Sequence, residues 1–132
     1  MEKQIVVSSK IENLRKVEKF VDEISAACKL NSELYGNILI ATLEAANNAI
    51  VHGNKLNEAL DVKLNAALSG KVLSIIVEDK GPGFDYKHIP DPTAPENIEN
   101  VSGRGVFLME KLSDKIDFKN NGSIVELYFI VE

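Results

Sequence analysis

The stretch VLSIIVEDKGPG, residues 72–83, decides the fold because it joins an apolar strand signal to an acid and two glycines. A second glycine cluster, Gly103-Arg104-Gly105, follows later in the chain. Glycine is favoured where the backbone must turn with φ > 0 or must approach a ligand closely. Asp79 comes at the end of the strand signal, where its carboxylate can accept a hydrogen bond from a ligand. Together the two clusters predict a pocket lined by main chain that binds a phosphorylated ligand.

Further strand signals lie on both sides of this stretch. Short apolar or alternating segments predict strands at 4–8 and 60–66, in addition to the one at 72–78. Near the end of the chain, the turn Asn120-Asn121-Gly122 separates two more segments with strand character. A turn of this composition between apolar segments is typical of an antiparallel hairpin.

Three helices are predicted from apolar periodicity. In the first, 9–28, Ser9 and Glu12 have the spacing of a capping box, so we expect this helix to begin directly after Ser9. The second, 31–52, is apolar nearly all round, so we expect it to be buried. The third is a short helix at 106–112, opened by the second glycine cluster. This order of elements predicts an α+β two-layer sandwich, in which a mixed, mostly antiparallel sheet carries helices on one face.

Composition narrows the range of partners. The chain has 132 residues, which fits a single domain over 1–132, and its net charge is −5. Lysine and arginine form no cluster longer than two residues, so nucleic acid is an unexpected partner. Cys28 is the only cysteine, which favours a reducing compartment. The sequence shows no signal peptide and no apolar run long enough to cross a membrane, so we expect a cytoplasmic protein with no membrane contact.

Two polar residues stand out on the second predicted helix. Glu44 and Asn48 are spaced i, i+4 and therefore share one face of an otherwise apolar helix. A carboxylate in such surroundings costs free energy unless it has a partner or a ligand. Oxygen atoms at this spacing suit Mg²⁺, which takes few protein ligands plus phosphates, and they also suit a carboxylate base beside the metal. A polar stripe facing solvent is the alternative explanation.

The order of these motifs resembles the GHKL ATPase family, which includes the ATP-binding domains of gyrase, Hsp90, histidine kinases and MutL. The matching features are a helix with E-x-x-x-N, a strand ending in D-x-G-x-G, a long intervening segment, G-x-G beside a helix, and Gly-Ser in the closing hairpin. The N-box of that family appears here as EAANNAIVHG, residues 44–53. This resemblance implies a Bergerat-type ATP-binding fold with ATP and Mg²⁺ as its ligands.

The resemblance also implies roles for residues at the phosphate end. Asn48 would ligate Mg²⁺, and Glu44 would be the base that polarises the attacking hydroxyl. Gly103 and Gly105 would let backbone amides reach the phosphates, and Arg104 would be the nearby cation. The long segment at 84–102 would form the lid.

At the adenine end, the resemblance implies four further binding residues. Asp79 would accept a hydrogen bond from the adenine amino group. Gly81 and Gly83 would line the base pocket. Ser123 would contact adenine directly or through water.

Within the family, the sequence is most similar to bacterial anti-sigma factor serine/threonine kinases, through IVHG at 50–53 and GRGVFLM at 103–109. This similarity implies a sigma factor and a STAS-type anti-anti-sigma protein as partners, and a homodimer. A nucleotide-binding module that switches partners without phosphoryl transfer is an alternative, because the lid segment is rich in acids and contains Lys87 as its lone cation. A sensor histidine kinase is disfavoured, because the sequence has no hairpin with a phosphoacceptor histidine.

Overall fold

The computed structural model describes residues 1–82 and 101–131, with residues 101–104 described by their backbone alone. Its sheet contains β1 (Glu2–Ser8), β2 (Asp61–Ser69), β3 (Val72–Glu78), β4 (Lys115–Lys119) and β5 (Ile124–Ile130). Its helices are α1 (Leu14–Cys28), α2 (Ser32–Asn47) and α3 (Val101–Leu112). Short helical turns occupy Ile11–Asn13, Asn48–Gly53 and Asn120–Gly122.

The strands form one five-stranded sheet with the order β1-β2-β3-β5-β4. All four pairings are antiparallel, so the sheet described here is wholly antiparallel rather than mostly so. β5 returns along β3 with Glu78 opposite Ile124, which brings the final hairpin to the end of the 72–78 strand. The predicted α+β two-layer architecture is confirmed.

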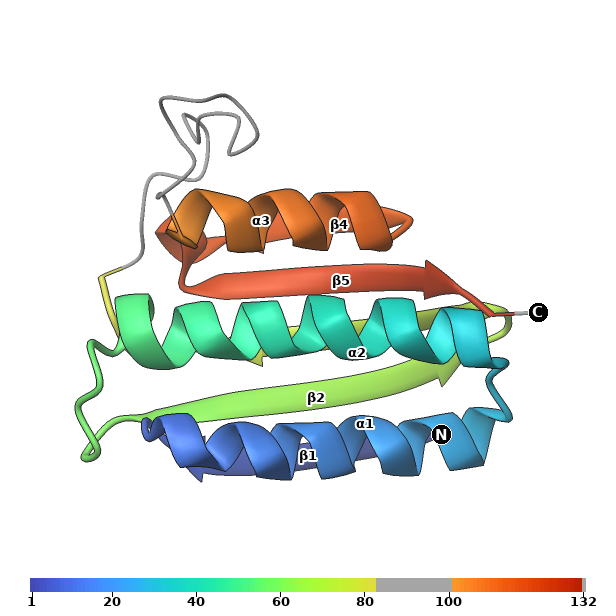
Figure 1. Cartoon of the computed structure of the whole chain (residues 1–132), viewed down its shortest axis with the longest axis horizontal. Coiled ribbons are helices and arrows are strands. Elements are labelled where there is room, and N and C mark those ends of the chain that lie inside the picture. The colour runs from blue at the N-terminus through green and yellow to red at the C-terminus, as the bar shows by residue number, and fades with distance from the viewer. Residues whose placement is uncertain (83–100, 132) are drawn as a thin grey trace.

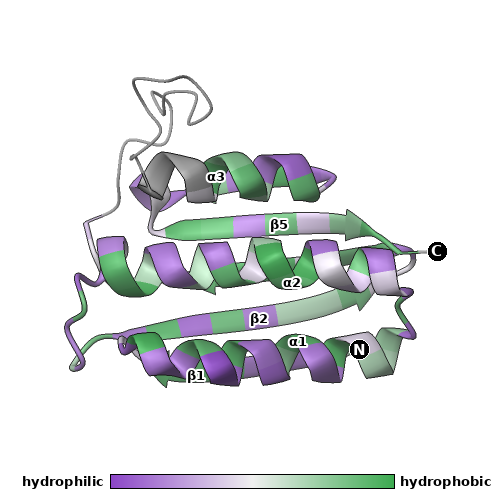
Figure 2. Ribbon diagram, in the orientation of Figure 1, coloured by the Kyte–Doolittle hydropathy of each residue, from purple (hydrophilic) through white to green (hydrophobic). Residues whose placement is uncertain are grey.

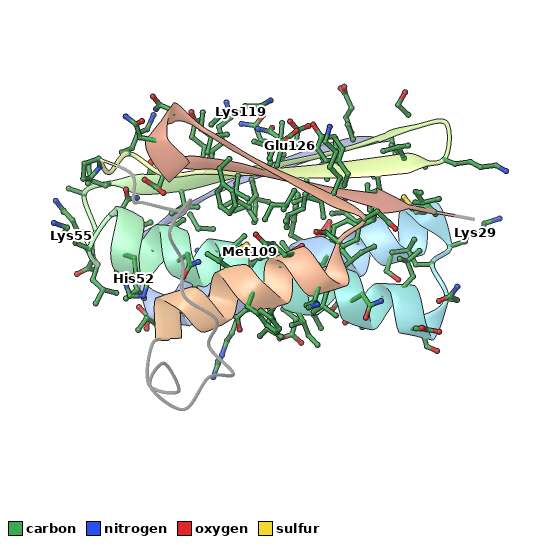
Figure 3. All side chains as sticks on the ribbon, turned by 90° about the horizontal axis from the view of Figure 1, so that it is seen from above. Lys29, His52, Lys55, Met109, Lys119 and Glu126 are labelled. Carbon is green, nitrogen blue, oxygen red and sulfur yellow. The ribbon has the colours of Figure 1, made fainter. Side chains whose placement is uncertain are left out.

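The helices cover one face of the sheet (Figures 1 and 3). Side chains on β2 alternate, and Val62, Leu64 and Ala66 point into the core. The same alternation appears as green and purple bands along β2 in Figure 2. The opposite face carries polar side chains such as Lys119 and Glu126, whose Nζ and Oε1 atoms lie 3.0 Å apart. This two-sided pattern arises because successive side chains of a strand point to opposite faces of the sheet.

Helix α2 lies between α1 and α3 (Figure 1). Its inner face is buried against the sheet through Ile38, Ala41 and Ala45. Its outer face is open enough that Ile40 is 45% exposed. The prediction of a helix buried on all sides is therefore wrong for this face: the neighbouring helices cover the flanks of α2, and no layer lies above it in the described residues.

Two predicted helix starts differ from the structure. Ser9 does not cap α1, which begins at Leu14 after a short 3₁₀ turn. The Ser9 hydroxyl instead donates to the carbonyl oxygen of Leu60 at 2.7 Å, so a long-range contact replaces the local one. Helix α3 begins at Val101, which places Gly103 and Gly105 inside the helix rather than before it. Glycine within a helix has a packing reason where another element comes close.

The structure also bears on membrane insertion. In the parts of the chain that it describes, no helix has both the length and the hydropathy that a membrane span requires.

Candidate functional site

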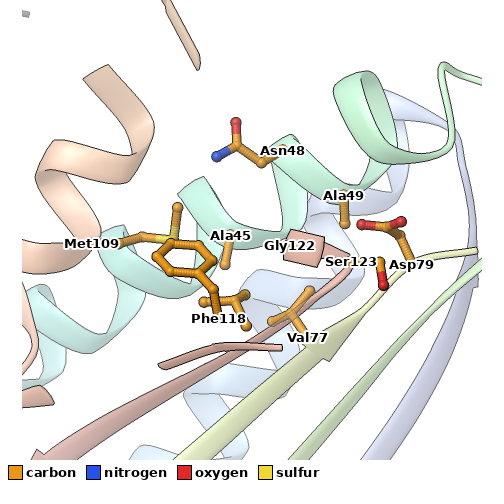
Figure 4. Close-up of a pocket in the computed structure, with 10 residues that line it drawn as sticks. Ala45, Asn48, Ala49, Val77, Asp79, Met109, Phe118, Gly122 and Ser123 are labelled. Atoms are coloured by element: carbon orange, nitrogen blue, oxygen red, sulfur yellow. The ribbon is translucent and has the colours of Figure 1, made fainter. Parts of the chain in front are cut away.

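A hollow lies at one end of the sheet, between the end of α2, the turn of the final hairpin and α3 (Figure 4). The empty space between these residues amounts to about 280 Å³ when the part that is open to solvent is counted. Asp79 lies at one end of it, and Met109 and Phe118 lie at the other. The remaining lining residues are Ala45, Asn48, Ala49, Val77, Gly122, Ser123 and Val125. Apolar side chains together with a few polar groups are typical of sites that bind small molecules.

The turn after β3 fixes the carboxylate of Asp79. The Gly81 amide donates to Asp79 Oδ1 at 2.8 Å, and the Asp79 amide donates to the Ser123 carbonyl oxygen at 2.9 Å. Asp79 is 8% exposed. Burial raises the pKa of Asp79 above its ordinary value of 3.8, the Gly81 hydrogen bond opposes that rise, and neighbouring Glu78 adds to it. The result is a buried hydrogen-bond acceptor at the border of the hollow.

Gly53 and Gly81 allow two chain segments to touch beneath this carboxylate. A Cβ atom on Gly81 would overlap the carbonyl oxygen of Gly53, which is backbone and cannot move aside easily. A Cβ atom on Gly53 would overlap the carboxylate of Asp79. Gly53 ends a π-helical turn, a form of helix that is frequent at functional sites. The glycines are therefore required for the turn after β3 to pack against the π-helical turn that follows α2.

Glu44, Asn48 and Gly105 meet where α2 contacts α3. A Cβ atom on Gly105 would lie 3.0 Å from Glu44 Oε2 and 3.4 Å from both Oδ1 and Nδ2 of Asn48. The absence of a side chain at Gly105 thus leaves a cradle above two oxygen-bearing groups. Asn48 also lines the hollow that contains Asp79, so it connects the two parts of the site. Oxygen donors of this kind fit Mg²⁺ that takes its remaining ligands from phosphates and water.

The hairpin turn places Ser123 against the hollow. Asn120, Asn121 and Gly122 have φ values of 53°, 58° and 91°, the left-handed region that asparagine and glycine adopt most readily. The Ser123 hydroxyl donates to the Asn120 carbonyl oxygen and accepts from Asn120 Nδ2, each at 2.9 Å. Ser123 is therefore held in place by the turn, and its hydroxyl proton is already engaged.

Part of the predicted site lies outside the described residues. Gly83 and the segment up to residue 100 belong to that part, and so does most of the expected lid at 84–102. Gly103 and Arg104 are placed by the backbone of α3 alone. Among the described residues, no cluster of three or more His, Cys, Asp or Glu side chains could hold a metal ion.

Sequence reasoning missed Asn54, which is 2% exposed and lies directly behind the Asp79 turn. Its Oδ1 accepts from the amide of Lys80 at 2.7 Å, and its Nδ2 donates to Ser9 Oγ at 2.9 Å. The signal for it was weak, because an asparagine after glycine also fits an exposed turn. Met109 and Phe118 were also missed as lining residues, because both fit ordinary core positions.

Comparison with known proteins gives the family. A family model for the histidine kinase-like ATPase domain matches residues 7–129. The chain belongs to the histidine kinase-like ATPase family. The match confirms the resemblance seen in the motifs and spans both parts of the site.

Individual members of this family are similar to the chain at modest identity. A serine-protein kinase RsbW from Oceanobacillus iheyensis is 27% identical over 95 residues, which cover 67% of this chain and 60% of the relative. An anti-sigma F factor from Clostridium kluyveri is 34% identical over 93 residues, covering 66% of this chain and 64% of the relative. The similarity thus spans less than two thirds of the length of each of these relatives.

A solved structure supports the fold. The structure of the RsbU and RsbW domains of a Mycobacterium tuberculosis protein superposes with a TM-score of 0.69, covering 98% of this chain and 32% of that one. The sequence identity is 19%, so this likeness shows the fold of this histidine kinase-like ATPase chain.

Proposed function

We propose that this chain binds Mg-ATP and transfers its γ-phosphoryl group to a serine or threonine of a STAS-type anti-anti-sigma protein, and that it also sequesters a sigma factor. The observation that carries the proposal is the position of Asn48. Asn48 lines the hollow that contains Asp79, and it lies beside Glu44 at the Gly105 cradle. A nucleotide whose base contacted Asp79 would then extend its phosphates toward Glu44.

Base recognition would belong to Asp79. Its Oδ1 accepts from the Gly81 amide, and no residue within 1–82 or 101–131 donates a hydrogen bond to its Oδ2. A buried carboxylate accepts strongly from an exocyclic amino group, because a hydrogen bond to a charged acceptor is stronger than one between neutral groups. Gly81 and Gly83 would flank the base, and Ser123 would contact it from the hairpin side.

Phosphoryl transfer would use Glu44 and Asn48. Glu44 would accept the proton of the attacking serine or threonine hydroxyl. The oxygen of that hydroxyl would bond to the γ-phosphorus while the bond from this phosphorus to the β–γ bridging oxygen breaks, and ADP would leave. Mg²⁺ held by Asn48 would neutralise charge on the phosphates, and Gly103, Arg104 and Gly105 would contact them from α3. Positioning and charge neutralisation are most of what this chemistry needs.

The partners follow from the family and from the names of its members. The relatives are named as serine-protein kinases and anti-sigma factors, which supports a sigma factor and a STAS-type protein as ligands of this chain. We include a homodimer and a cytoplasmic location in the same proposal. Light scattering of the purified protein tests the dimer.

A nucleotide-binding partner switch without catalysis is the second candidate. The observation that favours it is that Asn48, and not Glu44, lines the hollow. Binding of nucleotide needs Asp79 and Asn48, whereas a base is needed for transfer alone.

Substitution of Glu44 separates the two candidates. We expect Glu44→Gln to keep Mg-ATP affinity within about threefold and to lower transfer to the STAS-type proteins of the source organism by about 100-fold or more, the order of a general base. Mass spectrometry of the mixture measures the phosphate gained by each protein. Glu33→Gln is the matched control, because Glu33 lies on the exposed first turn of the same helix.

Two results would contradict the kinase proposal. Transfer that survives in Glu44→Gln removes Glu44 as the base. Nucleotide binding without transfer to any STAS-type protein, in the unaltered chain, supports the partner-switch candidate instead.

A further inference from the structure

We propose that Asn54 is the positioning residue that gives this chain its preference for adenine, because it locks the turn that carries Asp79. The inference rests on the proposed function, since it assumes that Asp79 contacts the base. Asn54 itself touches no part of the hollow and would act through the backbone of Lys80.

Only one assignment of donors and acceptors fits the three hydrogen bonds of the Asn54 side chain. The Lys80 amide can only donate, so the atom 2.7 Å from it must be the amide oxygen of Asn54. The amide nitrogen then donates to Ser9 Oγ at 2.9 Å and to the Asp61 carbonyl oxygen at 3.1 Å. The Ser9 hydroxyl donates its own hydrogen bond to the Leu60 carbonyl oxygen. A buried chain of this kind is fully satisfied only with an amide at position 54.

The hydrogen bonds tie the Asp79 turn to two distant segments. Ser9 directly follows β1, Leu60 directly precedes β2, and Asp61 is the first residue of β2. Nucleotide does not contact these two strand ends in the proposed site. Asn54 therefore anchors the Lys80 backbone to the rigid part of the fold.

This anchor sets the direction of the Asp79 carboxylate. Asp79 and Gly81 flank the anchored Lys80, and the Gly81 amide holds Asp79 Oδ1 at 2.8 Å. Gly53 packs against the other side of the same carboxylate, so closely that a Cβ atom added to Gly53 would overlap it. With Lys80 anchored behind it and Gly53 beneath it, the Asp79 side chain that lines the hollow is held in one position. A positioned acceptor discriminates between bases because a wrong base leaves it unpaired.

An aspartate at position 54 would break the anchor while keeping the side-chain size. Its second oxygen would face the Asp61 carbonyl oxygen, and both groups accept. Ser9 offers no proton to relieve this, because its hydroxyl donates to Leu60. The side chain would have to turn away, and the Lys80 amide would lose its partner.

The test compares ATP with inosine triphosphate, which carries a carbonyl in place of the adenine amino group. Titration calorimetry on the full chain with Mg²⁺ measures both affinities for the unaltered protein and for Asn54→Asp, Asp79→Asn and Asn57→Asp. We expect the unaltered chain to prefer ATP by about tenfold or more, which is the order expected for a charged hydrogen bond. Asn54→Asp should reduce this ratio to within about threefold of that of Asp79→Asn, and its affinity for inosine triphosphate should change by less than about threefold.

Asn57→Asp is the matched control. Asn57 is exposed, and its side-chain oxygen accepts from the Ala59 amide at 3.0 Å, a bond that an aspartate can also make. It makes the same change in atoms and charge close to Asn54, and we expect it to keep the preference for ATP.

The outcomes separate this inference from the proposed function. If the unaltered chain does not distinguish the two nucleotides, the proposed role of Asp79 fails. If Asp79→Asn loses the preference and Asn54→Asp keeps it, the role of Asp79 stands and the inference about Asn54 is wrong. Should Asn54→Asp not fold, as judged by circular dichroism, Ser9→Ala gives the same test. It removes one acceptor of the Asn54 amide, so it should lower the ATP preference by about threefold, and an unchanged preference would overturn the inference.

Discussion

At the scale of single residues, Asp79 combines two opposed demands. A carboxylate that is 8% exposed is costly to ionise, and burial raises its pKa. The same burial makes it a strong acceptor for a ligand. We expect a group with these properties to lower the stability of the free protein, and ligand binding to offset this loss. Groups with perturbed pKa values are frequent at functional sites.

This conflict predicts a pH dependence. Because the pKa of Asp79 in the folded state lies above its ordinary value of 3.8, the folded state keeps a proton that the unfolded state has already lost. The contribution of Asp79 to stability is therefore full below that value and is lost as the pH rises through the folded-state pKa. Asp79→Asn has no such titration, so without nucleotide we expect it to melt at a higher temperature than the unaltered chain near neutral pH.

Thermal melts from about pH 4 to about pH 7 measure this difference. The advantage of Asp79→Asn should grow as the pH rises. An advantage that shrinks with rising pH would mean that the folded state lowers the pKa of Asp79.

Single residues also show where sequence reasoning reached its limit. Glu44, Asn48 and Asp79 could be named in advance because their residue types and spacing carry chemical meaning. Asn54 could not, because its importance comes from Lys80 and Ser9, which are remote from it in the sequence and adjacent in space. A long-range polar contact leaves no periodic signal.

At the scale of elements, the turn after β3 depends on the absence of a side chain at Gly81. A Cβ there would overlap the Gly53 carbonyl oxygen, so we expect Gly81→Ala to lower the free energy of unfolding by about 1–3 kcal/mol, the usual cost of overpacking. Urea denaturation measures the change.

Gly36→Ala is the control for this prediction. Gly36 lies within α2, and a Cβ there would meet nothing within 4 Å. Alanine is the better helix former, so this variant should gain about 0.5–1 kcal/mol. Equal effects of the two substitutions would contradict the close approach of Gly53 and Gly81.

The contact between α2 and α3 makes a different prediction for Gly105. A Cβ at this position would lie 3.0 Å from Glu44 Oε2, the end of a side chain that can shift by rotation. Gly105→Ala should therefore keep or raise the melting temperature, because alanine favours the helix. The same change should weaken Mg-ATP binding by about tenfold, because it fills the cradle above Glu44 and Asn48.

Melting curves and calorimetric titration of Gly105→Ala measure the two effects separately. A variant that binds Mg-ATP as tightly as the unaltered chain would show that the cradle does not receive the phosphates.

Elements differ in how far the sequence predicts them. Strand β3 and the Asn120–Gly122 turn were predicted correctly, because alternation and positive-φ residues are local signals. The start of α1 was not, because Ser9 makes its bond to Leu60 rather than to the helix. The start of α3 was also predicted wrongly, because glycines in a sequence usually indicate the end of a helix. Only the contact with α2 explains why Gly105 lies inside α3.

At the scale of the whole molecule, the order of the motifs predicted more than any one motif. Helices early in the chain and hairpins late in it predicted the two-layer arrangement, and the antiparallel sheet brings the end of β3 and the turn of the final hairpin to one end of the sheet. The hollow lies at that end, where α2 and α3 cover the same face of the sheet (Figures 1 and 4). The exposed outer face of α2 could not be predicted, because apolar composition alone does not show how many neighbours a helix has.

Nucleotide binding at this end of the sheet should stabilise the entire fold, because the site joins α2, α3, β3 and the final hairpin. A ligand at about 100 times its dissociation constant adds about 2.7 kcal/mol to the free energy of unfolding. The most direct measurement is the melting temperature of the unaltered chain and of Asp79→Asn, each with and without saturating Mg-ATP. We predict a clear rise for the unaltered chain and little or none for Asp79→Asn, whereas no rise with any adenine nucleotide, or an equal rise in both proteins, would contradict an ATP site built on Asp79.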